Sequence, residues 1–264
     1  MTDTNIELTV SKLSKDMQAA AKQLSANEAR FLVDSYYTIQ DDRIRTGNQI
    51  SALSKSDDPH ELLDWLNSQA RNLEGFIKIA LDLYSEDCWG RSVKGIGPVL
   101  AAGLLAHIDI EKAPTVGHIW RYAGLDPTSK WKKGKKRPWN ANLKTLCWKI
   151  GESFVKFQDS QYGQAYVDRK KLEIERNEAG KFADQAEAIL KAKKIGKDTD
   201  AYKAYIEGRL PKAHIHARAK RYAVKLFLSH WHEMEYKKHY GKPPPLPYPI
   251  AHQDHVHLIA PQAA

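Results

Sequence analysis

The spacing of apolar residues predicts helices along almost the whole chain. Two long runs, over residues 26–54 and 59–81, place apolar side chains three and four positions apart, the spacing of one helix face. Ser25 and Glu28 match a capping box at the start of the first run. Because the loop of residues 55–58 between the runs is short, we expect the two helices to pack antiparallel. No alternating pattern typical of strands occurs, so the predicted fold class is all-α.

Further helical patterns precede and follow this hairpin. Short cap signals mark several of them: Asp58 and Pro59 before the second long run, Thr115 as a cap, Asn140 as a cap and Pro211 before the last helix. The glycine-containing residues 158–165 are expected to be a connection. The additional helices are predicted over residues 5–24, 116–123, 141–157, 166–177 and 213–240.

Changes in composition divide the chain into three predicted parts. Residues 1–84 form a coiled-coil-like helical hairpin, and residues 85–241 form a helical domain. Within that domain the Glu- and Lys-rich residues 172–212 look inserted. Residues 242–264 contain repeated prolines, which exclude a helix and favour an extended segment.

A glycine-rich turn opens the second part. Gly95 and Gly97 permit a tight turn, and Pro98 suits the first turn of a helix. Residues 81–92 are expected to form the partner helix before the turn. The pattern resembles the helix-hairpin-helix motif, which binds the DNA backbone without sequence specificity, although a sharp corner between two helices is the simpler alternative. Backbone amides and one lysine would hold a phosphate there, and the candidate residues are Lys94, Gly95, Ile96, Gly97 and Val99.

Positive charge is concentrated after the helical hairpin. The chain carries a net charge of +9, but residues 1–85 hold 9 basic and 13 acidic side chains. The remainder is therefore strongly basic, which indicates a surface for a polyanion. Two groups of residues are candidates for contact with phosphates, sugars or bases. They are Lys130, Trp131, Lys132, Lys133, Lys135, Lys136, Arg137 and Trp139 in a predicted loop, and Arg218, Arg221 and Lys225 on the last helix.

Cysteine and histidine content limits other kinds of chemistry. Cys88 and Cys147 are the only cysteines, which excludes a disulfide framework and, with no signal peptide and no long apolar run, predicts a cytoplasmic protein outside membranes. No cofactor is expected. A divalent metal remains an alternative through the histidines of the tail, His252, His255 and His257.

The glycine turn, the sequence Tyr122-Ala123-Gly124-Leu125-Asp126-Pro127, the basic loop and the last helix occur in a familiar order. Together they resemble the C-terminal transposase domain of the IS-one-ten family of insertion-sequence transposases, the bridge-RNA-guided recombinases. The resemblance spans residues 85–235. It implies a protein of a mobile element or phage that binds DNA, with structured RNA as the alternative. The helical hairpin resembles the dimerisation segment of that family, which implies a homodimer; a hairpin that packs only within one chain is the alternative.

Two departures from the family affect the expected chemistry. The family begins with a RuvC-like nuclease domain that carries acidic metal ligands, and no such domain is legible here. The family serine nucleophile corresponds to Lys132 or Lys133, while Ser129, the nearby serine, is out of register. We therefore expect a nucleic-acid-binding protein and lean against an enzyme. The alternatives are a shortened transposase, recombinase or nuclease that uses Ser129 or a metal, and a helical adaptor protein that binds no nucleic acid.

Overall fold

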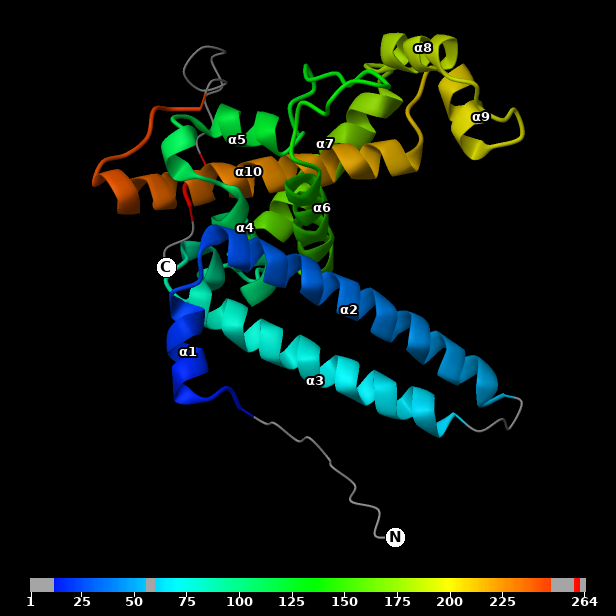
Figure 1. Ribbon diagram of the computed structural model, residues 1–264. Helices are drawn as coiled ribbons and strands as arrows, with labels where there is room; N and C mark the ends of the chain where they lie inside the picture. The colour runs from blue at the N-terminus through cyan, green and yellow to red at the C-terminus, as the bar shows by residue number, and fades with distance from the viewer. Residues whose placement is uncertain (1–11, 56–59, 248–258, 262–264) are drawn as a thin grey trace. The chain divides into compact units, whose positions relative to one another are not determined.

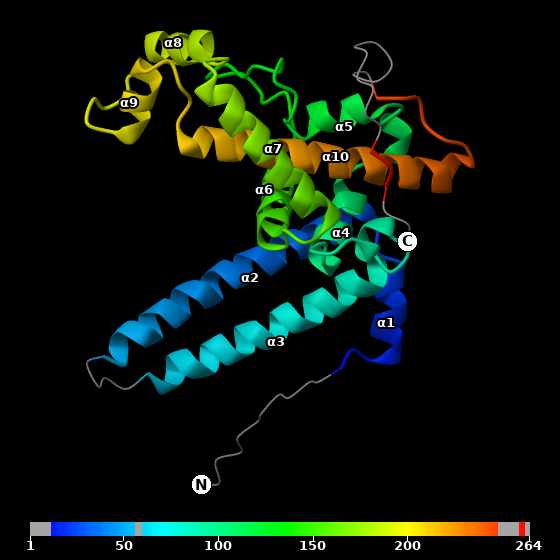
Figure 2. The same cartoon turned by 180° about the vertical axis from the view of Figure 1, so that it is seen from behind.

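A computed structural model describes residues 12–55, 60–247 and 259–261 of the chain. Helices dominate these residues and no strand occurs among them, so the all-α prediction is confirmed. The chain forms two compact units (Figures 1 and 2). The first contains residues 1–91 and 97–109, and the second contains residues 92–96 and 110–264. The assignment of functions to the three predicted parts stays a prediction.

The first unit is built on a long helical hairpin. Its helices are α1 (Lys15–Lys22), α2 (Ala26–Leu53), α3 (Glu61–Tyr84) and α4 (Pro98–His107). α2 and α3 lie side by side and run in opposite directions (Figure 1), as the sequence predicts. The capping box is present, because the Ser25 hydroxyl accepts from the Glu28 amide and the Glu28 carboxylate accepts from the Ser25 amide. An ion pair of 2.5 Å between Arg43 and Glu74 joins the two helices.

α4 closes the core of this unit at one end of the hairpin. Val99 and Ala102 of α4 pack with Val33, Ile77 and Leu81 of the long helices. Pro98 occupies the first turn of α4, where the sequence places it. None of the helices in the residues described combines the length and the hydropathy that a membrane span requires.

The second unit is organised around its last helix. Its described residues form the 3-10 turn η2 (Ile110–Lys112) and six helices. α7 and α10 make the most extensive contact in this unit, and α5 and α6 also pack on α10. Phe154, Tyr162 and Phe227 form an aromatic core where α6, α7 and α10 meet, with ring centroids 5.1–5.4 Å apart. The helices are α5 (Val116–Tyr122), α6 (Ala141–Lys156), α7 (Gln161–Glu178), α8 (Ala183–Ala192), α9 (Asp200–Ile206) and α10 (Lys212–Tyr240).

The predicted insertion over residues 172–212 begins inside α7 and continues with two short helices, which border a small core. α8 and α9 fold on each other, and Phe182, Leu210 and Ile215 are buried between them and α10. Inside the unit, the Glu173 side chain is completely buried. Arg218 Nε lies 2.7 Å and Arg169 Nη2 lies 2.5 Å from its carboxylate oxygens, so the carboxylate ties α7 to α10.

The helix predicted over residues 81–92 is wrong. α3 ends at Tyr84, and Trp89–Ser92 form a separate 3-10 turn, η1. The cause is local: the Ser85 hydroxyl and the Ser85 amide both donate to the Leu81 carbonyl, at 2.7 and 3.1 Å. Side-chain bonds of this kind compete with the continuation of a helix.

The expected connection over residues 158–165 is also wrong, because α7 already begins at Gln161. The Ser160 hydroxyl accepts from the Gly163 amide at 3.0 Å and caps the helix. Gly163 signals close packing here, since a Cβ at this position would lie 2.0 Å from the Phe157 carbonyl oxygen. A glycine that looks like a loop residue is therefore a contact between the helix and the preceding turn.

Smaller differences concern the ends of other helices. α1 begins at Lys15, so the predicted helix over 5–24 is shorter in its described part, and residues 1–11 lie outside that part. α3 begins at Glu61 with His60 at its N-cap, whereas the expected cap residues 58 and 59 lie outside the described residues. Thr115 precedes α5 without a capping bond from its side chain.

Candidate nucleic-acid interface

The first half of the glycine turn is held against the end of α6. Gly95 has φ +97°, a conformation that side-chain-bearing residues rarely adopt. The Ser153 hydroxyl donates to the Gly95 carbonyl at 2.5 Å, and a Cβ on Gly95 would lie 2.7 Å from that hydroxyl. Gly95 is therefore required on two grounds. Gly97 differs, because its φ of −84° suits any residue and the space around it is open.

Lys94 already has an anionic partner in the second unit. Its ammonium pairs with the Asp159 carboxylate and lies 5.8 Å from the centre of the Phe157 ring. The hydrogen bond from Lys94 lowers the pKa of Asp159. Both side chains are more than half exposed, so the pair is weak enough for a phosphate to replace the carboxylate.

The basic loop is irregular and exposed, as the sequence predicts. Trp131 folds the loop back on itself, because its indole N–H donates to the Lys135 carbonyl at 2.6 Å. The Arg137 guanidinium lies 5.5 Å from the centre of the Trp131 ring. Within the described parts of the chain, none of the six cations of residues 130–137 forms an ion pair with a carboxylate. Their charge is available to a ligand.

Trp139 anchors the far end of the loop to the Tyr122–Pro127 turn. Its ring lies against Gly124, where a Cβ would be 2.9 Å away, and the Lys144 ammonium lies 4.1 Å from the ring centre. The Asn140 amide and side chain donate to the Tyr122 carbonyl and hydroxyl, each at 2.9 Å. The position of Trp139 is thus explained by packing, whereas Trp131 is 43% exposed.

Positive charges from three elements converge beside this loop. The pKa of Lys144 on α6 is lowered by partial burial and then by the charges of Arg221 on α10 and Arg137 in the loop. Burial and the neighbouring Arg218 likewise lower the pKa of Arg221. These shifts show that Arg137, Lys144 and Arg221 are electrostatic neighbours. We call the six loop cations together with Lys144 and Arg221 the basic surface.

The other predicted cations of α10 are committed to partners inside the unit. Arg218 donates to the buried Glu173 carboxylate and lies 4.5 Å from the centre of the Phe182 ring. Lys225 lies 4.0 Å from the centre of the Trp120 ring, and burial lowers the pKa of its ammonium. Their charges are therefore less available than those of the loop.

Ser129 lies in a turn organised by Asp126. The Ser129 hydroxyl is 3.4 Å from one Asp126 oxygen, and the Thr128 amide and hydroxyl donate to the other at 2.9 and 2.8 Å. The hydrogen bond from the Thr128 backbone amide is the largest of the effects that lower the pKa of Asp126. A carboxylate with a lowered pKa is a weak proton acceptor, so Asp126 is poorly suited to activate a serine nucleophile.

The histidines of α10 make hydrogen bonds typical of structural residues. His216 and His230 contact the hydroxyls of Tyr166 and Tyr162 at 2.8 and 2.7 Å, and burial is the largest cause that lowers the pKa of each. His232 contacts the Ala113 carbonyl at 2.7 Å. Among the described residues no group of three metal-binding side chains occurs, and the tail histidines His252, His255 and His257 lie outside them.

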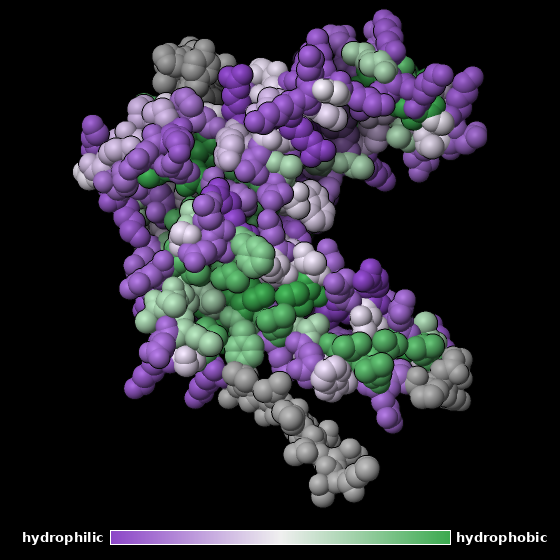
Figure 3. Space-filling view, in the orientation of Figure 1, coloured by the Kyte–Doolittle hydropathy of each residue, from purple (hydrophilic) through white to green (hydrophobic). Residues whose placement is uncertain are grey.

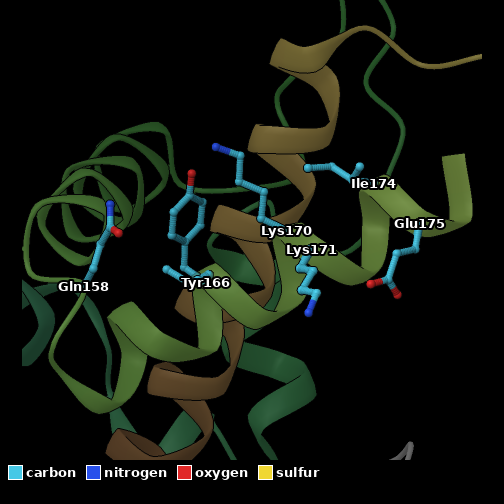
Figure 4. A pocket seen from close by; sticks show the side chains of 7 residues that line it. Gln158, Tyr166, Lys170, Lys171, Ile174 and Glu175 are labelled. Atoms are coloured by element: carbon cyan, nitrogen blue, oxygen red, sulfur yellow. The ribbon is translucent and has the colours of Figure 1, made fainter. Parts of the chain in front are cut away.

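A shallow pocket of about 450 Å³ lies on α7 (Figure 4). Lys170 and Lys171 line it but point in different directions in Figure 4, with Tyr166 and Glu175 also on its wall. Small-molecule sites bring a few polar groups together in an enclosed space. This pocket is open and its charges diverge, so we assign it no ligand.

Sequence reasoning missed two residues of this region, Lys144 and Trp148. Both are exposed on α6, one turn apart, while Leu143, Leu146 and Ile150 of the same helix are buried. The signal was present, because a tryptophan on the polar face of an amphipathic helix is not explained by the core.

Comparison with known proteins adds one relationship. No curated protein matches the chain, and no solved structure does. Residues 91–161 match the sequence model of the Transposase IS116/IS110/IS902 family. This stretch contains the glycine turn, α4, α5, the basic loop and α6, and therefore all of the basic surface except Arg221. Over these residues the chain is thus similar to the transposases of the IS116/IS110/IS902 family.

Proposed function

We propose that the basic surface binds the phosphate backbone of a nucleic acid, with DNA as the primary ligand and structured RNA as the alternative. One observation carries the proposal: six exposed loop cations have no carboxylate partner in the described residues, and one of them, Arg137, is together with Arg221 an electrostatic neighbour of Lys144. Such contacts position a protein on nucleic acid without reading its sequence. The family match supports the same ligand class.

The glycine turn supplies further phosphate contacts in this proposal. The amides of Gly95, Gly97 and Val99 would donate to phosphate oxygens, and Lys94 would exchange Asp159 for a phosphate. Ile96 supports the turn from within, since its side chain is buried. These contacts are the ones expected of a helix-hairpin-helix motif. The proposed role is that of a mobile-element or phage protein that acts in DNA recombination in the cytoplasm.

Charge substitutions in the loop test the proposal. The double change Lys132→Gln and Lys133→Gln should weaken binding of the full chain to a labelled DNA duplex and to a labelled RNA hairpin. The matched control is Lys197→Gln with Lys203→Gln, which removes the same charge from exposed positions of the α8–α9 region. Equal loss in both double variants would show that only net charge matters and would contradict a localised surface.

We further propose that the α2–α3 hairpin forms a homodimer. Leu62, Trp65, Leu66 and Leu73 follow one another along α3 and are 68%, 56%, 45% and 49% exposed. Figure 3 shows hydrophobic surface over the part of the molecule where the hairpin lies. Exposed apolar side chains at helical spacing are typical of helix–helix contacts between chains. Light scattering should give the mass of a dimer, and Leu62→Glu with Leu66→Glu should give that of a monomer; a monomeric wild-type chain would contradict the proposal.

A further inference from the structure

Trp148 is an aromatic side chain of the second unit that is not buried in its core. It is 56% exposed on α6, although its neighbours Leu146, Cys147 and Ile150 are almost completely buried. Tryptophan is highly buried on average, because its large apolar surface favours removal from water. Because Trp148 is exposed beside the basic surface, a ligand with an apolar face would remove its ring from water.

The indole is held in place from one side. The Lys220 ammonium of α10 lies 5.1 Å from the ring centre and pairs with Glu152 one turn further along α6. The stem of Lys220 lies against Gly151, and the Lys220 side chain is only 11% exposed. Lys220 thus supports the ring while more than half of the Trp148 side chain remains in contact with solvent.

A cationic side chain, that of Lys144, lies next to this ring. Lys144 precedes Trp148 by four residues, so the two side chains are neighbours on one face of α6. Arg137 and Arg221 are the electrostatic neighbours of Lys144. One face of α6 therefore presents an aromatic ring beside a cluster of cations, which are the two groups that a single nucleotide needs for its base and its phosphate.

The other two tryptophans near the loop are less suited to stacking. Trp131 uses its indole N–H within the loop, and Trp139 lies between Gly124 and Lys144. We propose that Trp148 stacks on an unpaired nucleobase while Lys144, Arg137 and Arg221 hold the adjoining phosphates. Bases inside a duplex stack on one another, so an aromatic platform selects nucleic acid with unpaired bases. This inference rests on the proposed function and names the class of its ligand.

The test compares two ligands for the full chain at one salt concentration. The ligands are a labelled single-stranded oligonucleotide and the blunt duplex of the same sequence, each prepared as DNA and as RNA. Trp148→Ala should weaken binding of the single strand roughly 5- to 150-fold, the range for loss of one stacked base. Binding of the duplex should change less than about twofold, because phosphate contacts remain.

Two further variants make the test decisive. Trp148→Phe keeps an aromatic face and should retain most of the single-strand affinity, which also separates stacking from misfolding. Phe31→Ala removes another exposed aromatic side chain, in the first unit, and should have no effect on either ligand. An equal loss for both ligands, or no loss for the single strand, would overturn the stacking proposal alone. A wild-type chain that binds no nucleic acid would overturn the proposed function together with it.

Discussion

The basic loop and α10 carry similar numbers of positive side chains but use them differently. The loop cations are exposed and have no carboxylate partner in the described residues, and Trp131 and Arg137 shape the loop around its own backbone. On α10, Arg218 pairs with the completely buried Glu173, and Lys220 pairs with Glu152. Positive charge in the loop therefore remains exposed to solvent, whereas much of that on α10 joins helices.

The difference follows from how much hydration each charged side chain loses when the protein folds. A buried carboxylate is tolerated only when cations and hydrogen bonds compensate for its lost hydration, so Glu173 holds Arg218 and Arg169 in place. The loop lysines remain hydrated and can exchange water and counterions for phosphates. A count of basic residues in a sequence does not separate these two uses.

The largest expected effect is the loss of the buried carboxylate. Glu173→Gln leaves the charges of Arg169 and Arg218 without compensation inside the unit, and we expect it to lower the free energy of unfolding by about 3–5 kcal/mol. Chemical denaturation of the full chain measures this change. Glu187→Gln, which breaks an exposed ion pair with Lys191 on α8, is the control and should have little effect.

A substitution in the basic loop should behave in the opposite way to Glu173→Gln when nucleic-acid binding and unfolding are both measured. Lys133→Gln should weaken nucleic-acid binding and leave unfolding unchanged, because its ammonium is exposed and has no carboxylate partner in the described structure. If Lys133→Gln destabilised the fold as strongly as Glu173→Gln, the contrast between the loop and α10 would be incorrect.

Backbone geometry predicts the next largest effect. Gly95→Ala introduces a side chain at φ +97° and 2.7 Å from the Ser153 hydroxyl, and should cost about 1–3 kcal/mol of stability. Gly97→Ala is the matched control two residues away. It should cost less than about 1 kcal/mol, since its φ is ordinary and only a helix N-cap is weakened. Equal thermal stability of the two variants would show that the turn does not depend on Gly95.

Acidic pH should weaken the contact between α7 and α10. Burial alone would raise the pKa of Glu173, but the hydrogen bond and charge of Arg218 and the charge of Arg169 lower it overall. A carboxylate whose pKa is lowered by folding stabilises the protein above its ordinary range of about 4–5 and loses that contribution as the pH falls through the folded value. The difference in melting temperature between the wild type and Glu173→Gln should therefore be constant near neutral pH and shrink below about pH 4. A difference that grows on acidification would contradict this assignment.

The smallest expected effect concerns Ser129. Ser129→Ala removes a long hydrogen bond of 3.4 Å to Asp126 and should leave binding to DNA unchanged. The decisive assay incubates the protein with supercoiled and branched DNA and a divalent metal. Cleavage by the wild type that disappears in Ser129→Ala would show that the loop is a catalytic centre and would replace the account of a binding surface.

The local signals of the sequence were sufficient for most of the fold. The Ser25–Glu28 capping box, Pro98 at the start of α4 and the Asn140 cap of α6 are all present, because each depends on residues within one helical turn. The signals failed where a contact from elsewhere decided the outcome. Gly163 looks like a loop residue until the Phe157 backbone is placed against it.

The candidate site could be predicted only in part for the same reason. The exposed loop follows from its charge repulsion, Gly134 and Pro138. The partners of Lys94 and Arg218 are far away in sequence, at Asp159 and Glu173. The sequence alone therefore could not show that these two positive charges are paired with carboxylates. Lys144 and the exposed Trp148 could have been identified from the polar face of α6.

The salt dependence of binding tests the central claim most directly. The affinity of the full chain for a labelled DNA duplex should be measured between about 50 and 200 mM monovalent salt. The account predicts a linear fall of log affinity with log salt, with a slope of about −0.9 for each phosphate contacted, and a slope less steep by about 2 for Lys132→Gln with Lys133→Gln. An affinity that does not change with salt, or a slope that the loop substitutions leave unaltered, would contradict it.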